Sequence, residues 1–153
     1  MAWLMNDADR DRLLADACPA GESYTAAAWG TLLGSAARML ALGAASNTYC
    51  YVGLTGHSLV LAAVNPMDIS RASGRLVVPL GTAERIRVSR GLLPGRYIVR
   101  LRTANAALRL CLTEGGLARV SGQRQAVRQI CSALQSLAGP GALPRAKPTC
   151  AQS

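Results

Sequence analysis

The sequence predicts an α+β domain in which about seven short antiparallel strands are followed by one amphipathic helix. Two observations lead to this prediction. The stretch from Arg85 to Leu112 contains three alternating apolar runs separated by two turn signals, as in a three-stranded meander. Residues 123–137 then place apolar side chains, the last of them Leu137, at helical spacing behind Ser121, a residue suited to capping a helix.

The length of 153 residues suits a single domain with a core of ordinary size. Half of the residues are apolar but Phe is absent, so we expect an aliphatic core. We divide the chain into a lead segment at 1–21, a domain at 22–138 and a disordered Pro-rich tail at 139–153. Asn6 or Asp7 can cap a short helix in the lead segment.

The strands before the meander are predicted from shorter patterns. Residues 22–33 suit a first strand, although their alanines leave a helix open. Residues 48–64 form the clearest hairpin, and its two strands are apolar on both faces, as in strands covered on both sides. The remaining assignments are a connection with a helical turn at 34–47, a polar loop at 70–74 and a short strand at 76–80.

The meander also predicts a surface. A two-residue turn at Pro94-Gly95 would place Arg87 opposite Arg102, and the next turn would place Arg100 opposite Arg109. Both registers put the apolar residues on one face and five arginines on the other, and a slip of one residue would mix the two sets. We name the second set the arginine face: Arg85, Arg87, Arg100, Arg102 and Arg109, with Ile98 and Cys111 among them.

The net charge of +9 is unevenly distributed along the chain. Residues 1–84 hold five Arg and seven acidic residues, whereas residues 85–153 hold eleven Arg and one Lys against Glu114 alone. Such a field attracts an acidic protein surface, an anionic membrane or phosphate group, or a nucleic-acid backbone. Nucleic acid fits least well, because no aromatic side chain stands among the arginines for base stacking. A solvated face without a partner would carry the same residues.

The sequence contains no pattern typical of an enzyme or a metal site. Five Cys without CxxC spacing, and a single histidine in a hairpin turn, predict neither a zinc site nor a general base. We therefore expect no catalytic residue, no cofactor and no metal. The alternative is a small enzyme whose site is assembled by the fold from His57 with Asp68, Glu84 or Glu114.

Cysteine usage and hydropathy bear on the location of the protein. The odd number of Cys and the acidic start of the chain indicate a reducing cytoplasm. Residues 25–45 have the length of a membrane span and Arg38 as their only charge, but Ala, Gly, Ser and Thr dominate them. We expect a cytoplasmic protein, or one that is peripheral at the membrane. This run, or Ile98 and Cys111, is also a candidate surface for a homo-oligomer.

The segment YVGLTGHSLVL, from Tyr51 to Leu61, resembles the hairpin between the second and third strands of bacterial pleckstrin-homology-like (PH-like) and GRAM-type domains. RLVVPLGTAERIRVSRG, then YIVRLRTANAALRLCL and a helix, is similar to their later strands and closing helix. The resemblance covers about residues 22–137 and departs at Ser58, where such domains often have a basic residue.

The resemblance implies a partly open antiparallel β-barrel of about seven strands, with the helix of residues 123–137 as its C-terminal capping α-helix. The short N-terminal helix of the lead segment precedes the stretch that the resemblance covers. It implies binding rather than catalysis. It does not imply a specific inositol-phosphate pocket, because the corresponding connection at 34–47 offers only Arg38.

Overall fold

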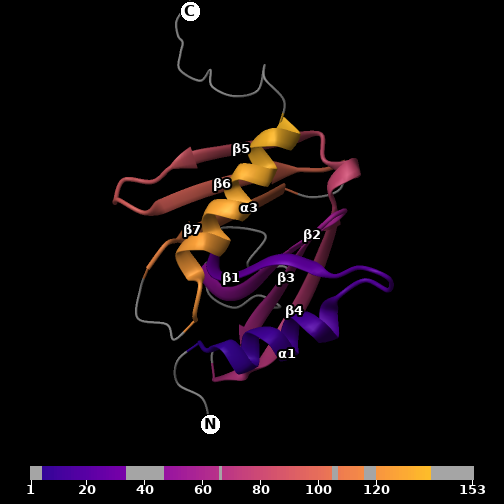
Figure 1. Ribbon diagram of the computed structural model, residues 1–153, viewed down its shortest axis with the longest axis vertical. Coiled ribbons are helices and arrows are strands. Elements are labelled where there is room, and N and C mark those ends of the chain that lie inside the picture. The colour runs from indigo at the N-terminus through magenta and orange to yellow at the C-terminus, as the bar shows by residue number, and fades with distance from the viewer. Residues whose placement is uncertain (1–4, 34–46, 66, 105–106, 116–119, 139–153) are drawn as a thin grey trace, which may run out of the picture.

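The computed structural model describes residues 5–33, 47–65, 67–104, 107–115 and 120–138. Seven antiparallel strands form one sheet in the order β4-β3-β2-β1-β7-β6-β5 (Figure 1). The elements are α1 (Asp7–Ala17), β1 (Tyr24–Leu33), β2 (Asn47–Thr55), β3 (Ser58–Asn65), β4 (Asp68–Pro79), a 3₁₀ turn (Leu80–Thr82), β5 (Arg85–Arg90), β6 (Arg96–Arg102), β7 (Ala107–Thr113) and α3 (Gln123–Ala138).

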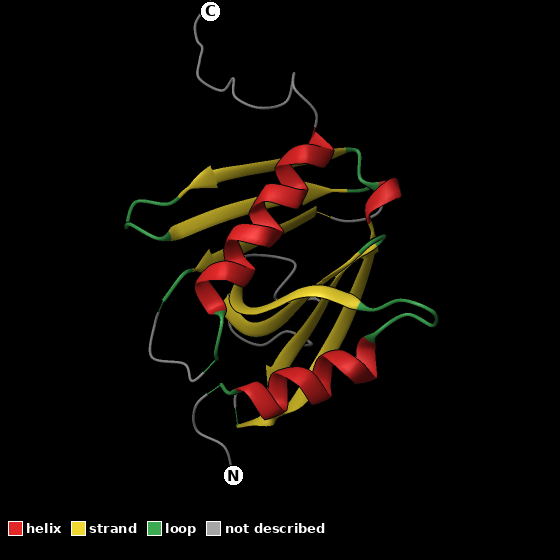
Figure 2. Ribbon diagram, in the orientation of Figure 1, coloured by secondary structure: helices red, strands yellow, loops and turns green. Residues whose placement is uncertain are grey.

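The sheet is bent but not closed, because β4 and β5 stand at its two ends and do not pair with each other. Strands β5–β7 run across the direction of β3 and β4, with α3 packed over β5, β7 and β1 (Figure 1). The N-terminal helix, α1, packs against β2–β4 on the opposite surface of the bent sheet (Figure 2). This is the PH-like architecture that the sequence predicted: about seven strands, a C-terminal capping helix and a short N-terminal helix.

Two apolar clusters hold these layers together. The larger cluster fills the inside of the bent sheet, where Val127, Ile130 and Leu134 of α3 pack on the inner faces of the strands. The smaller cluster joins Leu13 and Leu14 of α1 to the outer face of β2 and β3. Strand β3 is therefore buried on both faces, which explains why its sequence shows no polar alternation.

Helix α1 begins where the sequence predicted. The Asn6 side chain caps it by accepting a hydrogen bond from the backbone N–H of Asp9 at 2.9 Å. At α3, in contrast, Gly122 and not Ser121 precedes the first helical residue, and its carbonyl accepts from the Ala126 N–H. Leu137 does not complete the buried stripe either: it is 54% exposed, whereas Leu134 and Ala138 of the same end of the helix pack on the core.

The register of β6 with β7 is as predicted, but that of β5 with β6 is shifted by two residues. Pro94 and Gly95 do form a turn, in which the Arg96 N–H donates to the Leu93 carbonyl at 3.3 Å. The strands resume pairing only at Gly91, whose N–H donates to the Arg96 carbonyl at 2.7 Å, so two leucines are left at the tip. Arg87 consequently faces Arg100 rather than Arg102. A shift of two residues preserves both faces.

Strand β4 is much longer than predicted. The polar residues at 70–74 belong to it, and its pairing with β3 extends from Pro79 back to Asp68 with two register irregularities. The prediction of a loop was wrong because β4 is an edge strand, in which polar side chains can face water while the backbone still pairs with β3. The predicted connection at 34–47 and the tail at 139–153 lie almost wholly outside the described residues.

Candidate functional site

The arginine face is the outer surface of β5–β7, on the side away from α3. Along these strands the buried residues, such as Val99, Leu101 and Leu110, pack in the same cluster as α3. The arginines alternate with them and point outward, and all five are exposed. The structure thus places all five predicted residues on one surface, which looks away from the viewer in Figure 1.

Strand pairing arranges the five arginines in two rows. Arg87, Arg100 and Arg109 are direct neighbours across β5, β6 and β7, and Arg85 faces Arg102 in the next row. Neighbouring side chains within a row start about 5 Å apart, and the rows lie about 7 Å apart along the strands. Five guanidinium groups therefore share a patch that a single phosphorylated or carboxylate-rich group can span.

The arginine face borders a shallow hollow of about 360 Å³. The hollow lies at the end of the sheet where Leu33, the last residue of β1, pairs with Arg109. Its lining consists of all five arginines with four apolar residues and no carboxylate: Leu33, Arg85, Arg87, Arg100, Leu101, Arg102, Ala107, Leu108 and Arg109. A hollow of this volume is at the lower end of the range of small-ligand sites.

No acidic residue within the described ranges forms an ion pair with the arginine face. The ion pairs that those ranges contain involve Arg10, Arg12, Arg124 and Arg128 instead. Like charges directly opposite each other on neighbouring strands destabilise a sheet, by a few tenths to about 1 kcal/mol per pair. Water and salt screen part of this repulsion. An anion bound between the rows would remove more of it.

A sixth arginine extends this surface. Arg96 is exposed and alternates with Ile98 and Arg100 along β6, so it lies on the same side of the sheet, opposite Thr113. It was not assigned from the sequence because the predicted turn ended there. Its alternation with Ile98 is the signal that could have assigned it.

Aromatic residues are absent from the arginine face itself, as predicted, but Trp29 lies on the neighbouring strand, β1, and Tyr49 lies on the strand after it, β2. Trp29 and Tyr49 form a tilted pair with ring centroids 6.2 Å apart, and Tyr49 is 57% exposed. In the strand pairing, Thr31 of β1 lies between Tyr49 of β2 and Cys111 of β7. The aromatic pair was missed because β1 joins β2 to β7 only in the folded sheet, and sequence spacing does not show this neighbourhood.

Glu114, the only acid after residue 84, lies on the other side of the sheet. Its carboxylate accepts hydrogen bonds from Arg128 Nε at 2.8 Å and from the Tyr97 hydroxyl at 3.0 Å. The hydrogen bond from Arg128 lowers the pKa of Glu114, and the bond to Glu114 raises the pKa of Tyr97. Since its carboxylate is engaged with α3, Glu114 does not neutralise the arginine face.

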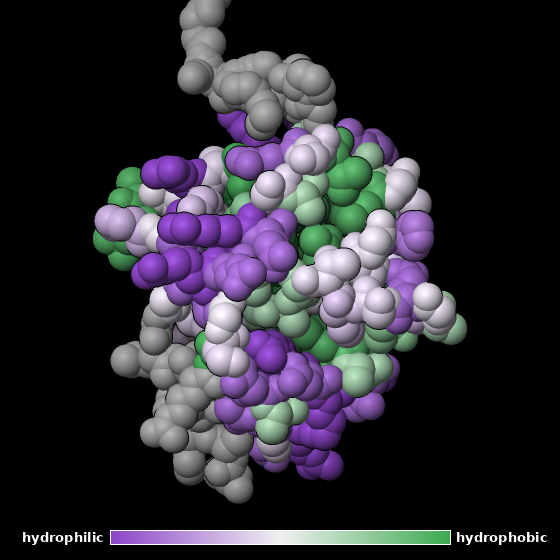
Figure 3. Space-filling model, viewed as in Figure 1, coloured by the Kyte–Doolittle hydropathy of each residue, from purple (hydrophilic) through white to green (hydrophobic). Residues whose placement is uncertain are grey.

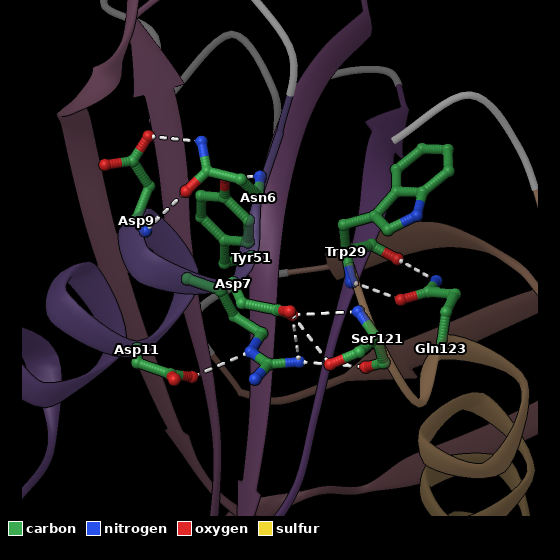
Figure 4. Close-up of polar contacts among 9 residues, drawn as sticks. Asn6, Asp7, Asp9, Asp11, Trp29, Tyr51, Ser121 and Gln123 are labelled. Atoms are coloured by element: carbon green, nitrogen blue, oxygen red, sulfur yellow. Dashed lines mark hydrogen bonds and ion pairs between the residues drawn. The ribbon is translucent and has the colours of Figure 1, made fainter. Parts of the chain in front are cut away.

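A second polar cluster ties the start of α3 to α1 and β1 (Figure 4). Asp7 accepts hydrogen bonds from the backbone N–H and the hydroxyl of Ser121, both at 2.8 Å, and the backbone bond lowers the pKa of Asp7. Gln123 accepts from the Trp29 N–H at 3.0 Å and donates to the Trp29 carbonyl at 2.9 Å. These hydrogen bonds join groups of the protein to one another, so the cluster holds α1, β1 and the start of α3 together.

The structure separates His57 from two of the three acids that the enzyme alternative names, Asp68 and Glu114. His57 is exposed in the turn between β2 and β3, where its backbone N–H donates to Thr55 Oγ1 at 3.1 Å. Asp68 lies at the opposite end of β3, and Glu114 is bound to Arg128. Within the described residues, no group of three or more His, Cys, Asp or Glu side chains is arranged to hold a metal ion.

The cysteines of the described ranges are free thiols. Burial raises the pKa of Cys50, and burial raises the pKa of Cys131 to about 12, so both side chains are neutral core thiols near pH 7. Cys18 and Cys111 are partly exposed. As for membrane spans, none of the helices in the described part of the chain has the length and apolar character to cross a bilayer.

No protein-family model matches the sequence, and no curated protein does. Solved structures do resemble the fold. The C-terminal domain of an unknown protein from Leishmania infantum aligns with a TM-score of 0.50 and 14% identity over 81% of this chain and 93% of that domain. The hSac2 domain of the human phosphoinositide phosphatase Sac2 aligns with a TM-score of 0.51 and 12% identity over 84% of this chain and 79% of that one. The linker-DH/PH structure of p115-RhoGEF aligns with a TM-score of 0.44 and 15% identity over 90% of this chain and 36% of that one. Identities this low concern the fold alone.

Proposed function

We propose that this protein is a non-enzymatic interaction module that binds an anionic group of its partner on the arginine face. One observation carries the proposal: five arginines from three neighbouring strands line one hollow, and no carboxylate lines it with them. A fold that needed these arginines only for solubility would not have to gather them opposite one another.

The chemistry of the hollow suits phosphate and carboxylate groups. Each guanidinium presents N–H donors in a planar fork that matches two oxygens of such a group, and these bonds are stronger than those between neutral partners. Arg100 stands between Arg87 and Arg109, so an anion bound over it contacts three cations at once. Binding would also relieve the repulsion within the row.

The proposal includes no catalytic residue. His57, the only histidine in the sequence, is exposed in the turn between β2 and β3. Two of the candidate acids, Asp68 and Glu114, bind Ser70 and Arg128 respectively. We therefore propose a binding role without cofactor or metal, in a protein that is cytoplasmic or peripheral at a membrane.

Titration calorimetry with two soluble anions, tripolyphosphate and a glutamate-rich peptide, tests the proposal. We expect R100T/R109T to bind at least one of them at least about 10-fold more weakly than the wild type, since two charge-assisted contacts are lost. The matched control is R71T/R75T, which removes two exposed arginines from β4. Equal affinities for the wild type and R100T/R109T, or equal losses in the two variants, would show that the face is only solvated.

The neighbouring aromatic pair supports a second candidate, single-stranded nucleic acid. Tyr49 is exposed, and only β1 separates its strand from β7, so a backbone held by Arg109 could place a base on the ring. A fluorescent oligonucleotide distinguishes the candidates. Tight binding that is lost in a Tyr49→Ala variant would favour nucleic acid, whereas weak, strongly salt-dependent binding that Tyr49→Ala does not change would favour the first proposal.

A further inference from the structure

The connection between β5 and β6 exposes two leucines at its tip. Leu92 has 104% relative exposure and Leu93 has 57%, so neither side chain is buried against the rest of the described protein. The hairpin projects from the left edge of the molecule in Figure 2, and Figure 3 shows hydrophobic atoms at that edge beside hydrophilic ones. Exposed leucines at a projecting tip are available to an apolar environment outside the chain.

The tip is held in shape by its own backbone. Gly91 and Arg96 pair across the base of the loop, Arg96 donates to the Leu93 carbonyl, and the Glu114 N–H donates to the Gly95 carbonyl at 2.7 Å. Gly95 has φ +75°, a conformation that other residues rarely adopt. The loop thus already holds the two leucines in exposed positions, and a partner that binds them does not have to order the loop first.

Cations surround the tip. Arg90 and Arg96 are exposed on either side of the leucines, and the tip residues from 90 to 97 border a hollow of about 230 Å³ that no acid lines. Arg96 also lies on the same side of the sheet as the arginine face. Glu114, which approaches Gly95, is already bound to Arg128. Arg96 therefore connects the apolar tip, at one end of β5 and β6, to the arginine face, which extends along these strands to the Arg85–Arg102 pair at their other end. Arg90 lies on the opposite side of the sheet, beside Tyr97.

We propose that this surface docks on an anionic lipid bilayer, with Leu92 and Leu93 inserted between the headgroups and the arginines on the lipid phosphates. An apolar tip with cations directly behind it matches the order of a membrane surface, in which the apolar interior lies below a negative layer. A protein partner would instead need a pocket shaped for two protruding leucines. The proposal names the partner of the arginine face, so it rests on the proposed function.

Sedimentation with vesicles tests the docking. Phosphatidylcholine vesicles containing about 30% phosphatidylserine should bind the wild type and pure phosphatidylcholine vesicles should not, because anionic lipid supplies the attraction. An L92S/L93S variant should bind the anionic vesicles at least about 10-fold more weakly, since the apolar insertion is lost. The matched control is Met67→Ser at the turn between β3 and β4, because Met67 is 82% exposed and lies elsewhere; it should bind like the wild type.

Tryptophan fluorescence distinguishes insertion from adsorption. In a Leu93→Trp variant, anionic vesicles should shift the emission to shorter wavelength, beyond any change that the native Trp3 and Trp29 show in the wild type. Wild-type binding by L92S/L93S, or an unshifted Leu93→Trp spectrum on bound vesicles, would overturn the inference. So would a wild type that binds tripolyphosphate or an acidic peptide but no vesicle, and then the proposed function would stand with a soluble partner. Failure to bind any of these anions would overturn both.

Discussion

At the scale of single residues, Gln123 connects three segments of the fold. Its pairing with the Trp29 backbone occurs where β1 loses β7 as a neighbour, because β7 pairs with β1 only at Gly30–Leu33. The same side chain donates to the Thr113 carbonyl at 2.8 Å. One buried amide thus takes the place of a missing strand at the bend of the sheet.

A Gln123→Met variant should lower the free energy of unfolding by about 2 to 3 kcal/mol, because the Trp29 N–H and two carbonyls lose their partner. Gln125→Met, at an exposed position of the same helix, should change it by less than about 0.5 kcal/mol. Urea denaturation of both variants measures the difference. Equal stabilities would mean that water replaces the amide without loss.

The Asp7–Ser121 contact should make stability depend on pH. Because the folded pKa of Asp7 lies below its ordinary value of 3.8, this carboxylate stabilises the protein above about pH 3.8, and the contribution is lost as pH falls through the folded pKa. At pH 7 an Asp7→Asn variant should be less stable than the wild type by about 1 kcal/mol or less, since the site is exposed. The gap should narrow as pH falls through the folded pKa of Asp7.

Urea denaturation at several pH values, repeated in a Ser121→Ala background, isolates this contact. With the Ser121 hydroxyl removed, the loss of stability caused by Asp7→Asn at pH 7 should be smaller than in the wild-type background, because one of the two hydrogen bonds is already gone. A gap that stays constant from pH 7 to pH 2 would contradict the assigned role of Asp7.

At the scale of elements, strands β5–β7 have a buried apolar inner face and an outer face on which neighbouring arginines repel one another. An Arg100→Thr variant should raise the free energy of unfolding by about 0.5 to 1 kcal/mol at low salt, because Arg100 opposes both Arg87 and Arg109. The gain should shrink as salt screens the charges. Thermal denaturation at two salt concentrations, with Arg75→Thr on β4 as control, measures it. A lower free energy of unfolding for Arg100→Thr than for the wild type would show that repulsion among these arginines does not destabilise the sheet.

These strands also show which features of the fold the sequence pattern can predict. The faces of the meander were predictable because alternation decides them, and so was the register of β6 with β7, which a short turn sets. The register of β5 with β6 was not, because Leu92 and Leu93 project from the tip rather than pair. The length of β4 was not predicted, because an edge strand pairs through its backbone groups and its side chains need not show an apolar pattern.

At the scale of the whole molecule, the acidic and basic parts of the sequence form different parts of the fold. Helix α1 carries acids and covers one end of the sheet, whereas the basic half of the sequence forms β5–β7 and α3. The five arginines could be assigned to one surface from sequence, and the fold places all of them in one hollow. Arg96 could have been added from its alternation with Ile98. Tyr49 and the leucine tip could not, since their relation to that hollow depends on strand neighbours and turn geometry.

The most direct test of the central claim is a map of the anion-binding surface by nuclear magnetic resonance. Backbone amide shifts of the wild type, followed during titration with tripolyphosphate, should change along β5, β6 and β7 around Arg87, Arg100 and Arg109, and these changes should weaken in R100T/R109T. Changes centred on Arg124 and Arg128 of α3 or on Arg71 and Arg75 of β4, or no changes at all, would contradict the claim that the arginine face binds anions.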